Sequence, residues 1–227
     1  MDALDLSGRI LFEDGEALVI DKPAGLPLDR PRAGGHALED YLDQLRLGFQ
    51  RQPQPVHRLD RDTSGCLLLA RNPKALKRFS AAFEARRVGK VYLGVVPGVV
   101  TEEEGTIELA LSKISSAEEG WRMIAAKKGK PAVTHWRRRE TIDGMTLVEF
   151  RPETGRTHQI RVHALLGLGS ALLGDPIYGA GPIGMGGGGP RTMLHASALT
   201  IEREGKPPIA AAAPMPADFL ALGFGDG

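Results

Sequence analysis

The chain has very little cysteine and no long apolar run. Cys66 is the single cysteine among 227 residues, which excludes an intramolecular disulfide and a zinc site built on several cysteines. No run of about 18 apolar residues is present, so we expect no transmembrane helix and no membrane partner. The segment Met1–Asp5 is acidic where a signal peptide would be basic. These absences predict a cytoplasmic protein.

The net charge is close to neutral, but the basic residues are concentrated. The formal net charge is +1, whereas residues 51–100 contain 10 Lys and Arg against 3 Asp and Glu. A second basic group follows at Lys127, Lys128, Lys130 and Arg137–Arg139. Local positive charge of this kind suits RNA, although charge alone is equally compatible with a solvated basic face.

Glycine and proline are frequent, which predicts short elements joined by tight turns. A hairpin is predicted over 9–22 and a helical segment over 36–47. The apolar run 66–70 predicts a buried strand. Asn72 as the N-cap and Pro73 as the first helical residue then predict a helix.

The second half of the chain contains mostly strand patterns. A second helix is predicted from Thr154, as its cap, to Leu166. The glycine-rich stretch 183–190 is predicted to be a flexible loop. Consecutive groups of strands favour an α+β fold with a largely antiparallel sheet. The further strands are predicted at 90–96, 106–111, 121–126, 131–139, 145–151 and 192–201.

Two dense polar clusters stand out. The first, His57–Gly65, directly precedes the predicted buried strand, where it is either a functional loop or an ordinary charged turn. The second, Thr154–His163, carries two Arg, two His and a Gln with few apolar residues. The polar side of such a helix must face solvent, a ligand or a buried charge.

These clusters resemble motifs of the RluA-type pseudouridine synthases. His57–Gly65 looks like the catalytic signature of that family, and four further segments match its other motifs in the same order. Five motifs in order make a chance match improbable, and the resemblance spans about residues 9–217. The four other segments are Asp21–Gly25, Lys90–Tyr92, Pro152–His163 followed by Gly174–Gly179, and Leu194–Ala196.

The resemblance implies a fold and an activity. The fold is α+β, with a mostly antiparallel, bisected mixed sheet, flanking helices and a central catalytic cleft. It implies one catalytic domain over residues 1–227, with a core at about 9–217 and no separate N-terminal RNA-binding domain. The implied activity is isomerisation of uridine to pseudouridine in a ribosomal or transfer RNA stem-loop, by a monomer, without cofactor or metal.

The resemblance also assigns three catalytic residues. Asp60 is the catalytic carboxylate, either as nucleophile at C1′ or as base at C2′, beside a sugar carbon that becomes electron-poor. Arg161 is the expected counter-ion, which would hold the pKa of Asp60 down. Tyr92 offers a ring to the uracil and a hydroxyl near C5. Asp62 is the rival carboxylate, for which we expect a turn role.

Other residues are predicted to bind the substrate. A target base inside a stem must leave the stack, and Arg58 resembles the arginine that fills the vacated place. Leu194 is expected to form an apolar wall. The predicted substrate-binding set is completed by His57, Thr63, Arg156 and His158.

Two other functions are compatible with parts of the sequence. One is a catalytically silent RNA-binding or chaperone protein of the same fold, against which the joint presence of Asp60, Tyr92 and Arg161 argues. The other is a metal-dependent nuclease that would use the His and Asp residues of the two clusters. Against it, His158 and His163 are five residues apart and would lie on different helix faces.

Four residues are predicted to be structural. Cys66 lies within an apolar run, which favours an inert core thiol. Asp175 lies in a Gly-Asp-Pro segment that is typical of a turn. Trp121 and Trp136 lie in strand patterns, and we expect both in the core.

Overall fold

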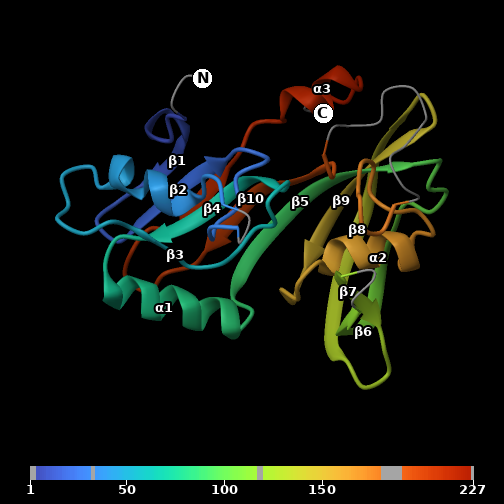
Figure 1. The fold of residues 1–227 in the computed structure, drawn as a ribbon, viewed down its shortest axis with the longest axis horizontal. Coiled ribbons are helices and arrows are strands. Elements are labelled where there is room, and N and C mark those ends of the chain that lie inside the picture. Colours follow the sequence, from blue (N-terminus) through green and yellow to red (C-terminus); the bar gives the residue numbers. More distant parts are fainter. Residues whose placement is uncertain (1–3, 32–33, 117–119, 180–190, 226–227) are drawn as a thin grey trace. The chain divides into compact units, whose positions relative to one another are not determined.

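Strands dominate the fold and helices are few (Figure 1). The computed structural model describes residues 4–31, 34–116, 120–179 and 191–225. The chain forms two compact units. The first unit comprises Met1–Lys90 and His195–Pro214, and the second comprises Val91–Leu194 and Met215–Gly227.

The first unit is built on a central strand that is buried along its whole length. Strand β4 (Ser64–Ala70) has every residue buried, as its apolar run predicts. The strand order is β1-β2-β4-β10-β11, with β3 also paired to β4. The β4–β10 pair is parallel and the other pairs are antiparallel. The other elements are η1 (Ser7–Arg9), β1 (Ile10–Glu13), β2 (Ala17–Lys22), η2 (Leu38–Leu45), β3 (Gln54–Pro55), α1 (Pro73–Glu84), β10 (Leu194–Ile201) and β11 (Ile209–Ala212).

The second unit contains five antiparallel strands in the order β5-β9-β8-β6-β7. Neighbouring residues of a strand point to opposite faces, so Val95 and Val96 enter two different cores. Val96 packs in a cluster with Ile160 of the helix α2, and Val95 packs in a cluster with Phe219 of α3. The elements are β5 (Val88–Pro97), β6 (Glu104–Ser116), β7 (Gly120–Ala125), β8 (Lys130–Ile142), β9 (Met145–Pro152), α2 (Gln159–Gly167) and α3 (Ala217–Ala221).

Most of the predicted elements are confirmed, as is the α+β class. Helix α1 begins at Pro73, and the Asn72 side chain accepts a hydrogen bond from the Ala75 N–H at 2.9 Å, as an N-cap does. The helical segment expected over 36–47 is a 3-10 helix, η2. The glycine-rich stretch 183–190 lies outside the described residues. No helix of the described residues is long and apolar enough to cross a membrane.

The predicted start of the second helix is wrong. Helix α2 begins at Gln159, five residues after Thr154. The Thr154 hydroxyl is used elsewhere: it accepts from the Val133 N–H of β8 at 3.1 Å and donates to the Gln159 side chain at 2.7 Å. The residue before the helix, His158, has a left-handed backbone with a φ of 52°. Contacts with β8 therefore override the local capping signal.

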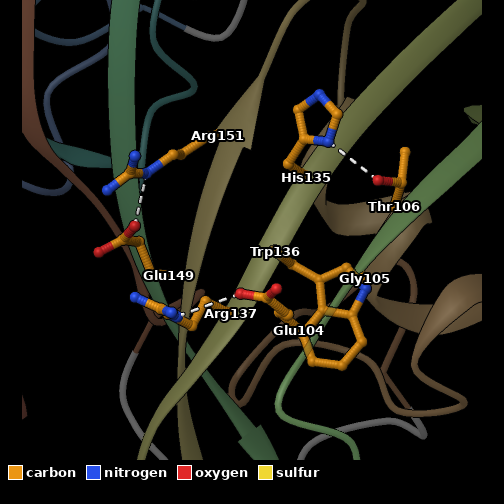
Figure 2. Close-up of a pocket in the computed structure, with 8 residues that line it drawn as sticks. All are labelled: Glu104, Gly105, Thr106, His135, Trp136, Arg137, Glu149 and Arg151. Carbon is orange, nitrogen blue, oxygen red and sulfur yellow. Dashed lines mark hydrogen bonds and ion pairs between the residues drawn. The ribbon is translucent and has the colours of Figure 1, made fainter.

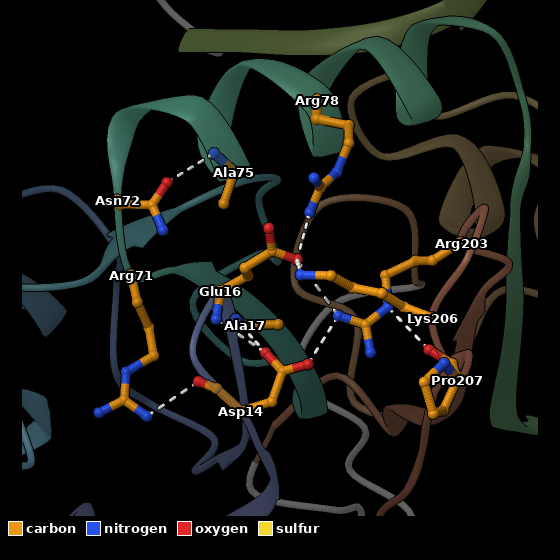
Figure 3. A network of polar contacts seen from close by, with 10 residues as sticks. All are labelled: Asp14, Glu16, Ala17, Arg71, Asn72, Ala75, Arg78, Arg203, Lys206 and Pro207. Carbon is orange, nitrogen blue, oxygen red and sulfur yellow. Dashed lines mark hydrogen bonds and ion pairs between the residues drawn. The ribbon is translucent and has the colours of Figure 1, made fainter.

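A polar network secures the edge of the first unit (Figure 3). Glu16 accepts from Arg78 at 2.6 Å and pairs with Lys206 at 2.9 Å. The Asp14 carboxylate pairs with Arg203 at 2.6 Å and also accepts from the N–H groups of the turn that follows it. Arg71, which is almost fully buried, pairs with Glu13 at 2.7 Å. The basic side chains at this edge are therefore matched by carboxylates.

Candidate active site

The loop that carries Asp60 joins β3 to β4 in the first unit. The Asp60 carbonyl accepts from the Thr63 N–H at 3.1 Å, which closes a tight turn. Leu59 and Thr63 are buried, whereas Arg58 is exposed and Asp60 is half-buried. The turn therefore holds its backbone inside the unit while the side chains of Arg58 and Asp60 reach its surface.

A fully buried lysine anchors this loop. Lys22, at the end of β2, has no exposed surface. Its ammonium donates three hydrogen bonds to carbonyls, those of Pro23 at 2.8 Å, Leu26 at 2.9 Å and Arg61 at 3.0 Å. The Arg61 carbonyl also accepts from the Gly25 N–H at 2.9 Å. A buried ammonium is stable only with such partners, so the segment after β2 and the residue next to Asp60 are fixed together.

Contacts with β10 fix the far end of the loop. Ser64 and His195 are register partners in the parallel β4–β10 pair, and the Ser64 hydroxyl lies 2.9 Å from His195 Nδ1. Gly65 has a φ of 101°, and a Cβ at this position would collide with the backbone of Ala196. Only glycine combines this conformation with so close an approach, which explains the residue that ends the His57–Gly65 cluster.

His57 is integrated into the first unit. Its Nε2 accepts a hydrogen bond from the Leu68 N–H at 3.1 Å, and its ring stacks on Phe83 of α1 with centroids 4.6 Å apart. Burial, together with the charge of Lys90, lowers the pKa of His57 to about 3. The ring is therefore neutral and ties the start of the loop to α1. Its predicted substrate contact stays a prediction.

Tyr92 lies in β5 of the second unit, where its register partner is Phe150 of β9. The half-buried Tyr92 ring packs against the cluster that contains Phe150 and Leu194. Leu194 is itself buried, and its carbonyl accepts from the Arg191 guanidinium at 3.0 Å. The structure thus brings Tyr92 together with the residue predicted as an apolar wall.

Arg161 of α2 forms a buried, two-pronged ion pair with Asp175. Its Nε and Nη2 donate to the two carboxylate oxygens at 2.7 and 2.8 Å, and the Asp175 side chain is fully buried. Burial alone would raise the pKa of Asp175, but hydrogen bonds from Arg161 and the N–H groups of Ile177 and Tyr178 hold it below its ordinary value. Asp175 therefore does more than shape a turn, because it fixes the predicted catalytic arginine.

Aromatic rings surround the start of α2. The His158 ring stacks on Trp121 of β7 at 4.8 Å, and its Nδ1 lies 2.9 Å from the Tyr178 hydroxyl. The same hydroxyl accepts from the Met123 N–H at 2.9 Å, and the Arg161 guanidinium lies over the Tyr178 ring. The β6–β7 hairpin is thereby tied to the helix that carries Arg161.

The structure settles the predictions for the tryptophans and the cysteine. Trp121 is 41% exposed, so its prediction as a core residue is wrong, because β7 is the last strand in the order of the unit and has no buried residue. Trp136 is buried, as expected. Cys66 is buried, and burial raises the pKa of its thiol to about 12, which fits an inert core residue.

The predicted site residues divide between the two units. The first unit carries His57, Arg58, Asp60 and Thr63; the second carries Tyr92, Arg156, His158, Arg161 and Leu194. In the first unit these residues lie in one loop, whereas in the second they lie in β5, at the start of β10, and in α2 with the segment before it. The pairing of Asp60 with Arg161 stays a prediction. Lys22, Asp175 and Tyr178 lie within the matched motifs, but their contacts with Arg61, Arg161 and His158 could not be read from the motifs alone.

A cleft of about 490 Å³ in the second unit lies apart from these side chains (Figure 2). It is lined by charged residues that neutralise one another, such as Arg137 with Glu104 at 3.4 Å and Arg151 with Glu149 at 2.6 Å. Among the described residues, no three His, Cys, Asp or Glu side chains are grouped to hold a metal ion. The lining residues are Glu104, Gly105, Thr106, His135, Trp136, Arg137, Glu149 and Arg151.

A buried histidine on α2 makes the stability of this unit depend on pH. His163 has no exposed surface, and neither ring nitrogen has a hydrogen-bond partner among the described residues. Burial lowers its pKa from 6.5 to about 4. The folded state therefore binds this proton only at a lower pH than the unfolded state does. His163 thus contributes stability that is complete above pH 6.5 and is lost as the pH falls towards 4.

We predict that His163→Leu flattens the pH dependence of unfolding. The wild-type free energy of unfolding should lose about 1.4 kcal/mol per pH unit through this one proton over that range. Urea unfolding at successive pH values would measure the slope in both proteins. An unchanged slope in the variant would show that His163 is not the responsible group.

The comparisons with known proteins agree with this geometry. A family described as RNA pseudouridylate synthase matches residues 16–166. An uncharacterized RNA pseudouridine synthase of Zymomonas mobilis is 54% identical over 96% of this chain and 99% of its own length. Ribosomal large subunit pseudouridine synthase D of Xanthomonas campestris is 37% identical over 96% of this chain and 69% of its own. The structure of human RNA pseudouridylate synthase domain containing 1 matches 92% of this chain and 83% of its own, with a TM-score of 0.74 and 30% identity. With its fold, its motifs and these relatives in agreement, the chain belongs to the RNA pseudouridylate synthase family.

Proposed function

We propose that this enzyme isomerises uridines in a ribosomal or transfer RNA stem-loop, with Asp60 as the catalytic carboxylate. The supporting observation is the anchored turn: the carbonyl of Asp60 binds the Thr63 N–H, and the carbonyl of Arg61 binds Lys22 and Gly25. A carboxylate that must meet one sugar carbon needs a backbone that is fixed before the substrate arrives. Asp60 has such a backbone.

Isomerisation of uridine to pseudouridine requires one charged carboxylate and one proton acceptor. The N1–C1′ bond breaks, the uracil turns, and a C5–C1′ bond forms. The C5 proton leaves and N1 ends protonated, so the substrate is neither oxidised nor reduced, and no cofactor or metal is proposed. Asp60 would act on the electron-poor sugar, either at C1′ or as the base at C2′.

Tyr92 and Arg161 are proposed to complete the catalytic set. The Tyr92 ring would stack on the turned uracil and place its hydroxyl near C5. Arg161 would be the counter-ion of Asp60 while its guanidinium is held by Asp175. A guanidinium has five donors, and two of those of Arg161 bind the Asp175 carboxylate.

The other residues predicted to contact the substrate differ in how far they are exposed. Arg58 is exposed and free to reach the stem, where it would fill the place of the flipped base. Arg156 is half-buried, and its Nε donates to the Pro131 carbonyl at 3.2 Å. Contacts of the buried Thr63 and His158 with the substrate would require RNA to enter deeply. We propose a cytoplasmic monomer.

Asp60→Asn should abolish turnover and spare RNA binding. The amide keeps the shape but removes the charge, and loss of a central catalytic group lowers turnover on the order of 10⁴-fold. Tritium release from uracil C5 would measure turnover, and filter binding would measure affinity, with Asp62→Asn as the matched control. Turnover by Asp60→Asn would move the catalytic role to another residue. A wild-type protein that binds RNA without turnover would favour the silent RNA-binding alternative.

The role of Arg161 can be separated from simple phosphate binding. Arg161→Ala alone would leave the Asp175 carboxylate buried without its partner, which lowers stability by about 3–5 kcal/mol. The test therefore uses the double variant Arg161→Met/Asp175→Asn. We expect turnover at saturating RNA to fall about 10²-fold or more, with an unchanged salt dependence of binding. Asp175→Asn alone, which keeps Arg161 and one oxygen that can accept from it, shows how much of the loss comes from the Asp175 change. A normal maximal rate with a salt slope reduced by about one phosphate contact would contradict the assignment.

Lys22→Met should weaken both the fold and the catalysis. The variant removes one donor from each of three carbonyls, of which that of Arg61 keeps the Gly25 N–H, and this should lower the free energy of unfolding by about 2–4 kcal/mol. The released Asp60 turn should lower turnover at least about tenfold without changing the salt slope. Lys77→Met, an exposed change on α1, is the control. A Lys22→Met protein with wild-type stability and turnover would contradict the anchoring role.

A further inference from the structure

Two arginines follow the last turn of α1 and are exposed to solvent. Arg86 and Arg87 come directly after the helix cap Ala85. Among the described residues, neither guanidinium forms an ion pair or a side-chain hydrogen bond. Several other basic side chains of the first unit are neutralised by carboxylates, as Arg78 is by Glu16 at 2.6 Å (Figure 3). Arg86 and Arg87, here called the basic pair, are therefore positive charges that the fold does not use.

The backbone of the basic pair is strained. Helix α1 ends in a Schellman motif, in which the Arg87 N–H binds the Ala82 carbonyl at 2.9 Å and the Arg86 N–H binds the Phe83 carbonyl at 3.1 Å. Arg86 is the left-handed residue of this motif, with a φ of 57°. Glycine is the usual residue there, because it has no Cβ. Folding alone would thus favour glycine at position 86.

The basic pair adjoins the catalytic loop. Phe83, three residues before Arg86, stacks on the ring of His57, the first residue of the His57–Gly65 cluster. After the pair the chain enters β5, where Lys90 adds a positive charge close enough to lower the pKa of His57. The loop itself presents Arg58 to solvent. Positive charge is therefore concentrated where α1 meets the loop that carries Asp60.

We propose that the basic pair is a docking surface for the RNA backbone, where Arg86 and Arg87 each bind a phosphate that flanks the target uridine. This inference rests on the proposed function and adds the place where the substrate backbone lies. Planar guanidinium groups bind phosphate with two donors. A polyanion is the partner whose charge complements two exposed arginines without acidic partners.

The position of the pair also suggests a simpler role. The C-terminal end of a helix carries a partial negative charge, so cations near it stabilise the helix. In that role, loss of the charges would lower stability and leave RNA affinity unchanged. The strained backbone of Arg86 makes the two roles separable. A change to glycine relieves the strain, so stability and affinity should move in opposite directions.

The test compares Arg86→Gly, Arg87→Gln and their combination with the wild-type protein. The probe is a fluorescein-labelled, uridine-containing RNA stem-loop, titrated at several salt concentrations. Each single change should reduce the slope of log affinity against log salt by about 0.7–0.9, and the combination by about twice that. Affinity of the combination should fall about tenfold at low salt. The melting temperature of Arg86→Gly should rise by about 1–3 °C.

Lys74→Gln is the matched control. Lys74 is also exposed and lies in the first turn of the same 12-residue helix, about 15 Å from its other end. It should change the salt slope by less than either arginine variant. Unchanged RNA affinity in the combined variant would overturn the proposal, as would an equal effect of Lys74→Gln. Turnover at saturating RNA should stay normal in the basic-pair variants. Asp60→Asn should show the reverse pattern, so the two proposals can fail separately.

Discussion

The buried ammonium of Lys22 is the interaction on which the geometry of the first unit depends. An ammonium without water must direct all three N–H groups at acceptors, and here the acceptors are the carbonyls of Pro23, Leu26 and Arg61. Two of these carbonyls follow β2 directly, and the third adjoins Asp60. One charge therefore holds together two segments that are far apart in the sequence. Because each bond satisfies a charge, a small shift of the loop is opposed more strongly than neutral hydrogen bonds would oppose it.

The second unit fixes its predicted catalytic cation in a similar way. Arg161 donates to both carboxylate oxygens of Asp175. The same carboxylate also accepts hydrogen bonds from the backbone N–H groups of Ile177 and Tyr178 in the turn that follows. The turn residue Tyr178 then places its ring beneath the guanidinium and its hydroxyl against His158. Buried ion pairs are often neutral for stability. Here the ion pair fixes the orientation of the Arg161 guanidinium, because two parallel hydrogen bonds to one carboxylate define its plane and direction.

The sequence predicts the features that depend on local chemistry. The Asn72 cap, the buried β4 strand and the positions of most strands along the chain follow from capping, apolar runs and alternation. The start of α2 does not, because the Thr154 hydroxyl bonds to Val133 of β8, which lies 21 residues earlier in the sequence. The exposure of Trp121 depends on which strand is last in the unit. In the site, the motifs predict Asp60 and Arg161, but the ion pair between Arg161 and Asp175 depends on the tertiary fold.

The arginines of the first unit differ in their surroundings. Arg71 and Arg203 are almost fully buried and pair with carboxylates, so their charge is already neutralised within the fold. Arg58, Arg86 and Arg87 are exposed. An enzyme that must turn a nucleotide out of a stem has to hold the backbone on either side while the base moves. Charges already bound by carboxylates are poorly suited to that task, since each phosphate contact would first break an ion pair. The exposed arginines beside the Asp60 loop can bind phosphate without that loss.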